Sequence, residues 1–213
     1  MKYYPAFLDL RERPCLVVGG GAVAERKAVS LLDAGADVTV ISPALTPKLH
    51  DLASVGRISH RNKSFEDRDI DGFFLVIAAT DSQEINTGTA RLCRKRQVPV
   101  NVASPPEESS FIVPSVIERG QLLIAVSTSG VSPALSRKIR QDLQKQFGPE
   151  YDVFLQRLTA IRQRVLNEVA DDEVRRNIFR MIVDSDVVDL LRQGKTDEAE
   201  LRMIMIAGLK HRP

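Results

Sequence analysis

The stretch CLVVGGGAVA, residues 15–24, decides the fold because it joins an apolar run directly to a cluster of small residues. The run CLVV is typical of a buried strand. Gly19, Gly20 and Gly21 then permit a tight turn, and Ala24 is small enough for the next segment to pack closely on the strand. The stretch therefore predicts a strand, a glycine turn and a helix, the opening unit of a parallel α/β sheet.

An alternation of apolar runs and helical stretches continues this unit. The runs CLVV, VTVI, FFLVIAA, VPVNVA and FIVP predict strands of a parallel sheet, with crossover helices between them. We expect the first crossover helix to end at Gly35 and the second to begin near Asp81 and Ser82. Helical spacing puts four apolar residues on the core side of the first helix: Val23, Ala28, Leu31 and Leu32.

The sequence pattern of alternating strands and helices ends at Pro114. The segment SVIERGQLLIAVS predicts two strands around a turn at Arg119 and Gly120. Ser132 and Pro133 are typical of the N-cap and first residue of a helix, and helical spacing continues from there to the end of the chain. The fold class is therefore α/β: a Rossmann-type parallel sheet domain over 1–113, a small α+β unit over 114–149 and a helical C-terminal domain over 150–213.

Composition narrows the class of partner. The formal net charge is only +2, so no overall field indicates nucleic acid or an anionic membrane, and we expect neither partner. No apolar run approaches the roughly 18 residues of a membrane span, and the N-terminus lacks a signal-peptide core, so we expect a cytoplasmic protein. Cys15 and Cys93 lie in unrelated contexts and are interpreted as reduced packing residues.

The strand, glycine turn and helix together predict NAD as the cofactor, with its pyrophosphate at the helix N-terminus. The acidic residue that usually binds the adenosine ribose, roughly 20 residues further on, is missing, and Ser42 stands in its place. No Arg adjoins Ser42 to pair a 2′-phosphate, which favours NAD over NADP. Asp81 has an alternative interpretation as a helix N-cap. The predicted cofactor-binding residues are Gly19, Gly20, Gly21, Ala22, Val23, Ser42, Pro43, Ala44, Ala79, Thr80, Asp81, Asn101 and Val102.

The assembled pattern resembles the precorrin-2 dehydrogenase family in its stand-alone form, and the N-terminal half of bifunctional sirohaem synthases. The matching segments cover almost the whole chain, and SFIVPS and STSGVSP are more specific than the glycine turn. The segments are PAFLDLRERPCLVVGGGAVAERKA, LLDAGADVTVISP, FFLVIAATD, VPVNVA and SSFIVPSVIERGQLLIAVSTSGVSPALSRKIR.

This resemblance implies oxidation of precorrin-2 to sirohydrochlorin with NAD as hydride acceptor, in sirohaem biosynthesis. It also implies a homodimer formed through 114–149, and a tetrapyrrole-binding site. Precorrin-2 carries many carboxylates, so its site should offer N–H donors and cations, which the helix N-terminus at Ser132 and the later Arg137, Lys138 and Arg140 can provide. The expected substrate-binding residues are Ser110, Phe111, Ser127, Thr128, Ser129, Gly130 and Ser132.

The chain departs from the family pattern at Ser104, where members commonly carry an Asp that handles protons and metal insertion. A serine hydroxyl is neutral and cannot act as a carboxylate base. Hydride transfer mainly requires positioning, so dehydrogenation is expected to survive the change. Iron insertion is expected to survive only if Glu107, Glu108 or Asp81 replaces the Asp.

Three alternatives stay open at this point. The first is a bifunctional dehydrogenase and ferrochelatase, the second an NAD-sensing regulatory module, and the third a dimerisation scaffold without catalysis. A sensor has no need for the SFIVPS and STSGVSP segments. His50, His60 and His211 lack ligand-type spacing, so no metal site is predicted.

Overall fold

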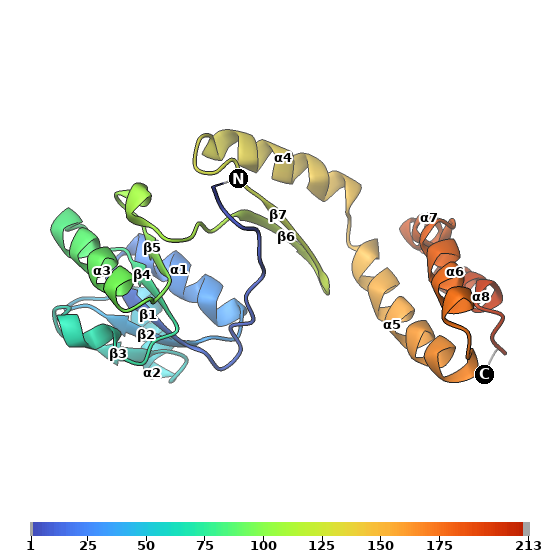
Figure 1. Ribbon diagram of the computed structural model, residues 1–213, viewed down its shortest axis with the longest axis horizontal. Helices are drawn as coiled ribbons and strands as arrows, with labels where there is room; N and C mark the ends of the chain where they lie inside the picture. Colours follow the sequence, from blue (N-terminus) through green and yellow to red (C-terminus); the bar gives the residue numbers. More distant parts are fainter. Residues whose placement is uncertain (1, 211–213) are drawn as a thin grey trace. The chain divides into compact units, whose positions relative to one another are not determined.

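The computed structural model of the protein describes residues 2–210. The chain divides into two compact units, Met1–Val113 and Pro114–Pro213. The first is an α/β unit and the second combines a strand pair with helices (Figure 1). His211 lies outside the described residues.

The first unit is built on one five-stranded parallel sheet with the order β3-β2-β1-β4-β5. From β1 the chain adds β2 and β3 on one side and then β4 and β5 on the other, as in doubly wound nucleotide-binding folds. The Rossmann-type fold predicted from the sequence is confirmed. Its strands are β1 (Pro14–Val18), β2 (Asp37–Ile41), β3 (Ser59–Arg61), β4 (Leu75–Ala78) and β5 (Val100–Val102).

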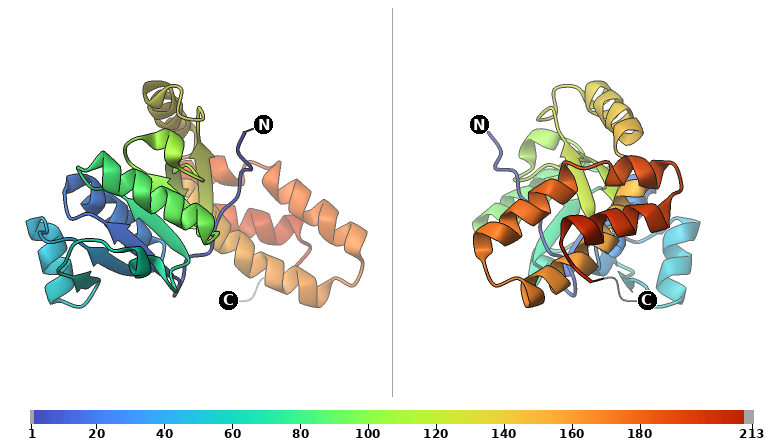
Figure 2. Two further views of the ribbon diagram at one scale, coloured as in Figure 1. Left: turned by 60° about the vertical axis from the view of Figure 1, so that its left-hand side comes forward. Right: turned by 90° about the vertical axis from the view of Figure 1, so that its right-hand side faces the viewer.

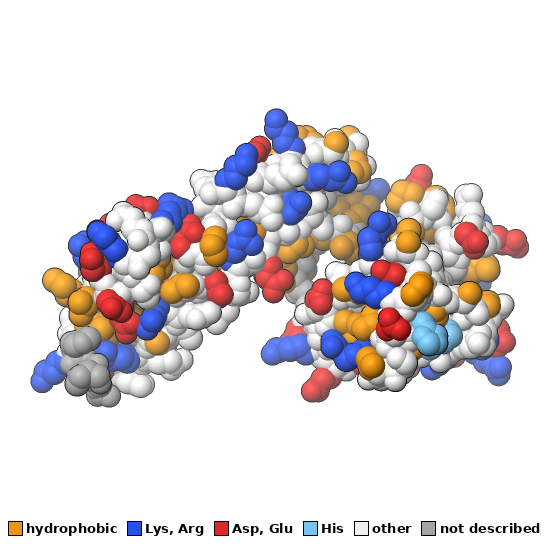
Figure 3. Space-filling view, turned by 180° about the vertical axis from the view of Figure 1, so that it is seen from behind, with side chains coloured by type: hydrophobic (Ala, Val, Ile, Leu, Met, Phe, Trp, Pro, Cys, Tyr) orange, Lys and Arg blue, Asp and Glu red, His pale blue; other side chains and the backbone are white. Residues whose placement is uncertain are grey.

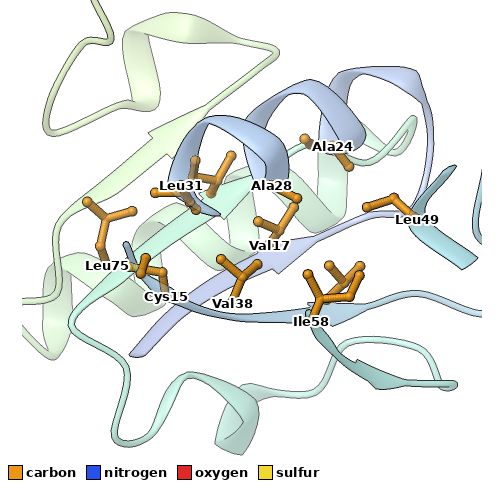
Figure 4. Packing of buried hydrophobic residues seen from close by; sticks show 13 residues of the cluster. Cys15, Val17, Ala24, Ala28, Leu31, Val38, Leu49, Ile58 and Leu75 are labelled. Carbon is orange, nitrogen blue, oxygen red and sulfur yellow. The ribbon is translucent and has the colours of Figure 1, made fainter. Parts of the chain in front are cut away.

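Two hydrophobic cores cover the two faces of this sheet, because successive side chains of a strand point to opposite faces. Cys15 and Val17 of β1 belong to the core under α1 (Ala22–Asp33) and α2 (Pro47–Ser54), which Figure 4 shows from close by. Leu16 and Val18 belong to the opposite core, under α3 (Gln83–Lys95). Burial on both faces explains why these strands are continuous apolar runs.

Two local expectations were wrong, and one strand was missed. Val23 is exposed, and Ala24 takes its place on the buried side of α1 with Ala28 and Leu31. The run FIVP forms no strand within the described residues. Strand β3 was not expected at all, since its sequence Ser-His-Arg is polar and lies at the sheet edge.

The second unit begins with an antiparallel hairpin of β6 (Ser115–Arg119) and β7 (Leu122–Val126), followed by α4 (Pro133–Gln146). The Ser132 hydroxyl caps α4 by accepting a hydrogen bond from the Leu135 amide, as expected. Four further helices pack around one apolar core (Figure 2). They are α5 (Glu150–Glu168), α6 (Asp172–Val183), α7 (Val187–Arg192) and α8 (Thr196–Ile206).

Positive and negative side chains are interspersed on the face shown in Figure 3, in keeping with a net charge of +2. Between residues 2 and 210, no helix has the length and apolar character that a membrane crossing requires.

Candidate functional site

The predicted cofactor residues gather where parallel strands of the first unit end. The carboxyl ends of β1, β2, β4 and β5 lie at one edge of the sheet, because these strands run in the same direction (Figure 1). The helices α1 and α3 leave β1 and β4 on opposite faces of the sheet. Such a switch point is where open α/β sheets bind their ligands.

Packing against neighbouring loops requires glycine at the first two positions of the turn. Gly19 has φ +119°, and a Cβ there would lie 2.5 Å from the Ala79 carbonyl oxygen. A Cβ on Gly20 would overlap the carbonyl oxygen of Ala44. The Gly19 amide donates to the Ile41 carbonyl at 2.9 Å, which ties the turn to the end of β2.

Gly21 differs from its two neighbours because nothing in the protein requires glycine there. Its φ is −84°, it is exposed, and a Cβ would meet no atom within 4 Å. Gly21 is the N-cap of α1 and has no side chain to cap it; within residues 2–210 the amides of Ala22 and Val23 have no hydrogen-bond acceptor. Open space beside free helix amides fits a pyrophosphate group.

Ser42 is largely occupied by local contacts. Its hydroxyl, in a side chain only 9% exposed, donates to the Ala44 carbonyl at 2.7 Å. The Ser42 carbonyl lies 2.9 Å from Nε2 of His60 on β3. Ser42 therefore keeps only acceptor capacity for a ribose hydroxyl, whereas Pro43 and Ala44 beside it are exposed.

The loop after β4 leads from the buried Ala79 through Thr80 into α3. Ser82 is the N-cap of that helix, since its hydroxyl accepts from the Ile85 amide at 3.3 Å. The interpretation of Asp81 as the N-cap was therefore wrong, and its side chain is exposed at the sheet edge.

Side-chain hydrogen bonds in both directions hold the segment after β5 against the strand. The Asn101 side-chain amide donates to the Phe111 carbonyl at 3.1 Å, and the Ser109 hydroxyl accepts from the Val102 amide at 2.8 Å. The Ser110 hydroxyl accepts from the Val100 amide at 2.8 Å. The Ser110 amide also donates to the Val100 carbonyl at 2.8 Å, and Phe111 packs against the core under α1.

Ser104 is exposed, and its carbonyl accepts from the Asn86 side chain at 3.0 Å. Three carboxylates were named as possible substitutes for an Asp there: Asp81 and Glu107 are exposed, and Glu108 is paired with Arg94 at 2.7 Å. The guanidinium of Arg94 also donates to the Glu108 carbonyl at 2.8 Å. The Glu108 carboxylate therefore belongs to a contact that holds this loop against α3.

The expected substrate loop lies in the second unit, before α4. The Thr128 hydroxyl accepts from the Ser132 amide at 3.0 Å, and the Ser127 hydroxyl accepts from the Ser129 amide at 3.0 Å. Ser129 and Gly130 have positive φ angles of 55° and 87°, so the loop is a tight turn. Most of its polar groups build the loop, and the exposed cations Arg137 and Lys138 are the groups left for an anion.

Sequence reasoning missed Asn86, a buried polar residue on α3 that bonds to the loops after both β4 and β5. Its signal is a polar residue at a core position of an amphipathic helix, in line with Ala90 and Cys93.

In the described part of the chain, no group of three His, Cys, Asp or Glu side chains is placed to hold a metal ion. Both cysteines are free, and burial raises the pKa of the Cys15 and Cys93 thiols to about 11.

Comparison with known families gives two matches. The model described as "Putative NAD(P)-binding" matches residues 6–115, and the one described as "Sirohaem biosynthesis protein central" matches residues 119–146. The first match covers the whole parallel sheet, and the second covers most of the hairpin and α4.

Two relatives with similar sequences are siroheme synthases. The chain is 41% identical to siroheme synthase of Thioalkalivibrio sulfidiphilus over 93% of this chain and 41% of that protein. It is 40% identical to siroheme synthase of Methylococcus capsulatus over 94% of this chain and 42% of that protein. It spans less than half the length of these relatives. Among solved structures, SirC, a precorrin-2 dehydrogenase, matches with a TM-score of 0.79 and 27% identity over 95% of this chain and 100% of that one.

Proposed function

Because this chain belongs to the NAD(P)-binding family, and its resemblance to precorrin-2 dehydrogenases is confirmed, we propose that it oxidises precorrin-2 to sirohydrochlorin with NAD. When bound, NAD accepts a hydride from the substrate, which also loses a proton, so the products are sirohydrochlorin, NADH and a proton. The binding of NAD is supported above all by the surroundings of Gly21, where open space adjoins the free amides of α1. The substrate part rests on the likeness to SirC across both units.

The residues of the first unit have the task of holding and orienting the cofactor. The amides of Ala22 and Val23 would donate to the pyrophosphate oxygens, and Gly21 would leave room for them. The loop at Thr80 and Asp81 forms the next part of the edge. In the second unit, Arg137 and Lys138 on α4 attract the carboxylates of precorrin-2.

NAD is the proposed cofactor in preference to NADP. The nearest cation on the neighbouring strand is Arg61 of β3, whose guanidinium lies 3.7 Å from Asp69 and 5.6 Å from the Phe73 ring centre. The Arg61 side chain is half-exposed, and these two contacts engage its guanidinium, which supports the preference for NAD. We expect NAD to bind at least about tenfold more tightly than NADP, a difference of ~1.4 kcal/mol. Isothermal titration with each nucleotide measures this, and equal affinities would contradict it.

We also propose a homodimer formed through the hairpin. Val116 and Leu123 are 43% and 44% exposed and lie on one face of the hairpin, since their register partners are Ala125 and Glu118. With Ala125 these residues make most of the face apolar, and Glu118 adds a carboxylate to it. An exposed apolar patch is typical of a protein interface. A cytoplasmic location is proposed because Cys15 and Cys93 are free, as is usual in a reducing compartment.

We do not propose that this protein inserts iron. Ser104 offers no carboxylate, and the Glu108 carboxylate is held by Arg94. The test is anaerobic incubation of the protein with precorrin-2 and NAD, followed by the absorbance of NADH and sirohydrochlorin, and then addition of ferrous iron. NADH and persistent free sirohydrochlorin are expected. Accelerated sirohaem formation would mean that the protein is also a chelatase, and no NADH would refute the proposed oxidation.

A further inference from the structure

The buried face of α3 carries two polar residues, Asn86 and Thr89, which are 1% and 0% exposed. Thr89 satisfies itself within the helix by donating from its hydroxyl to the Ile85 carbonyl at 2.8 Å. Asn86 makes its side-chain bonds outside the helix. Asparagine is a poor residue for a helix interior, so local helix stability does not explain its presence.

The Asn86 side-chain amide bonds through both its nitrogen and its oxygen. Its Nδ2 donates to the carbonyls of Thr80 and Ser104, each at 3.0 Å. Its Oδ1 accepts from the Thr80 amide at 3.1 Å and lies 2.8 Å from the Thr80 hydroxyl. A side-chain amide has two donors and two acceptor lone pairs, so three of the four positions are filled by main-chain groups. The fourth faces the Thr80 hydroxyl, whose one hydrogen also has the Ser82 carbonyl within reach at 3.0 Å. A flipped amide would place Oδ1 against two carbonyl oxygens, which fixes the orientation.

These bonds join two loops that leave neighbouring strands. Thr80 follows β4 and Ser104 follows β5. The main chain still links the strands where the Ala103 amide donates to the Ala78 carbonyl at 2.9 Å. Asn86 adds a side-chain link two residues beyond Ala78 and one residue beyond Ala103, at the edge where the cofactor is proposed to lie.

We propose that Asn86 is a positioning residue, which fixes the β4 loop at Thr80 and the β5 loop at Ser104 relative to each other and so orients that edge for NAD and for turnover. The turnover part rests on the proposed function; the NAD part requires only the nucleotide site. Displacing groups at such a site by about 1 Å can cost on the order of a hundredfold in rate.

Two variants of Asn86 and one control test this role. Asn86→Ala removes all four contacts, and we expect NAD to bind at least about tenfold more weakly, with a similar or larger loss in kcat. Thr89→Val is the control, since it removes a buried hydroxyl on the same helix face without touching either loop. NAD affinity and kcat of the control should stay within about twofold of wild type.

The Asn86→Asp variant separates positioning from general loss of stability. A protonated carboxyl can donate to one of the two carbonyls, whereas the ionised form faces both of them with a negative charge. Burial raises the pKa of such a carboxyl. NAD affinity should therefore recover as the pH falls from about 8 to about 6 in this variant, and stay flat in wild type and Asn86→Ala. Wild type controls for titration of Asp81, Glu107 and Glu108, which lie on the connected loops.

All NAD titrations are made below the unfolding midpoint of each variant, as followed by circular dichroism. Folded Asn86→Ala with wild-type NAD affinity and kcat would overturn the proposal, as would losses in Thr89→Val equal to those in Asn86→Ala. If Asn86→Asp does not fold, Asn86→Ala against Thr89→Val decides. Should wild type bind NAD but leave precorrin-2 unchanged, the proposed function fails, while the NAD affinities of the variants still decide the role of Asn86.

Discussion

Three adjacent glycines occupy the turn after β1, and each has a different reason to be glycine. Gly19 needs its positive φ, and Gly20 needs the absence of a Cβ because Ala44 lies against it. Gly21 has neither constraint. Packing explains the first two, whereas the open space beside Gly21, at the N-cap of α1, fits the proposed cofactor.

This difference gives the first prediction. Gly21→Asp should abolish NAD binding without lowering the melting temperature, because Asp is a favourable N-cap and its carboxylate occupies and repels the phosphate position. Gly20→Ala should instead lower folding stability by about 1–3 kcal/mol, since its Cβ overlaps the Ala44 carbonyl. Thermal unfolding and NAD titration of both variants measure this. Tight NAD binding by Gly21→Asp would place the cofactor elsewhere.

The buried thiols give a second prediction at the same scale. With pKa values of about 11, Cys15 and Cys93 are protonated at neutral pH, and thiols react with alkylating agents as thiolates. Iodoacetamide should leave both unmodified in the native protein at pH 8 and label both in urea. Mass spectrometry reads the outcome, and rapid native labelling of either thiol would contradict the burial of β1 and α3.

The sequence could predict the site only as far as local patterns reach. The glycine turn is visible because its strand, turn and helix are contiguous. The engagement of the Ser42 hydroxyl with Ala44 depends on how the loop after β2 turns back, which no spacing reveals. Asn86 was missed because its partners, Thr80 and Ser104, lie on two different loops. The role of the predicted site residues in binding stays a prediction.

At the scale of elements, the central strands were predictable because burial on both faces leaves continuous apolar runs. Strand β3 was missed since its three residues are polar and form the sheet edge. The run FIVP is as apolar as a strand, but side-chain bonds of Asn101 and Ser110 accompany the main-chain bond from the Ser110 amide to the Val100 carbonyl, and no regular ladder forms in the described residues. Apolar content alone cannot distinguish these cases.

The connection after β3 gives a third prediction. Asp69, 5% exposed, lies 2.9 Å from the Lys63 ammonium and accepts from the Glu66 amide at 2.8 Å. Burial raises the pKa of the Asp69 carboxyl, but these two bonds together lower it by more than burial raises it, so the net shift is downward. Asp69→Asn should cost about 1–3 kcal/mol at pH 7.

A lowered pKa fixes the sign of the pH dependence. The contribution of Asp69 is complete above its unfolded pKa of about 3.9, and is lost as the pH falls through the lower folded value. The stability difference between wild type and Asp69→Asn should therefore shrink below about pH 4. Urea unfolding at pH 7 and pH 3 tests this, and a constant difference would show that the ionised carboxylate contributes nothing.

At the scale of the whole molecule, two units carry different parts of the proposed chemistry: a nucleotide site in Met1–Val113 and an anion-attracting helix in Pro114–Pro213. The homodimer gives a fourth prediction. Light scattering should return twice the chain mass of 23.7 kDa, and Val116→Glu with Leu123→Lys should return the single mass, because charges would replace the apolar face of the hairpin. A monomeric wild type would refute the dimer.

The central claim is that this chain transfers a hydride from precorrin-2 to NAD bound at the glycine turn. The most direct measurement is the yield of NADH and sirohydrochlorin from precorrin-2 and NAD without oxygen, for wild type and Gly21→Asp. Equimolar NADH and sirohydrochlorin with wild type, and neither above the enzyme-free rate with Gly21→Asp, is the predicted result. No NADH with wild type, or full activity in Gly21→Asp, would contradict the account.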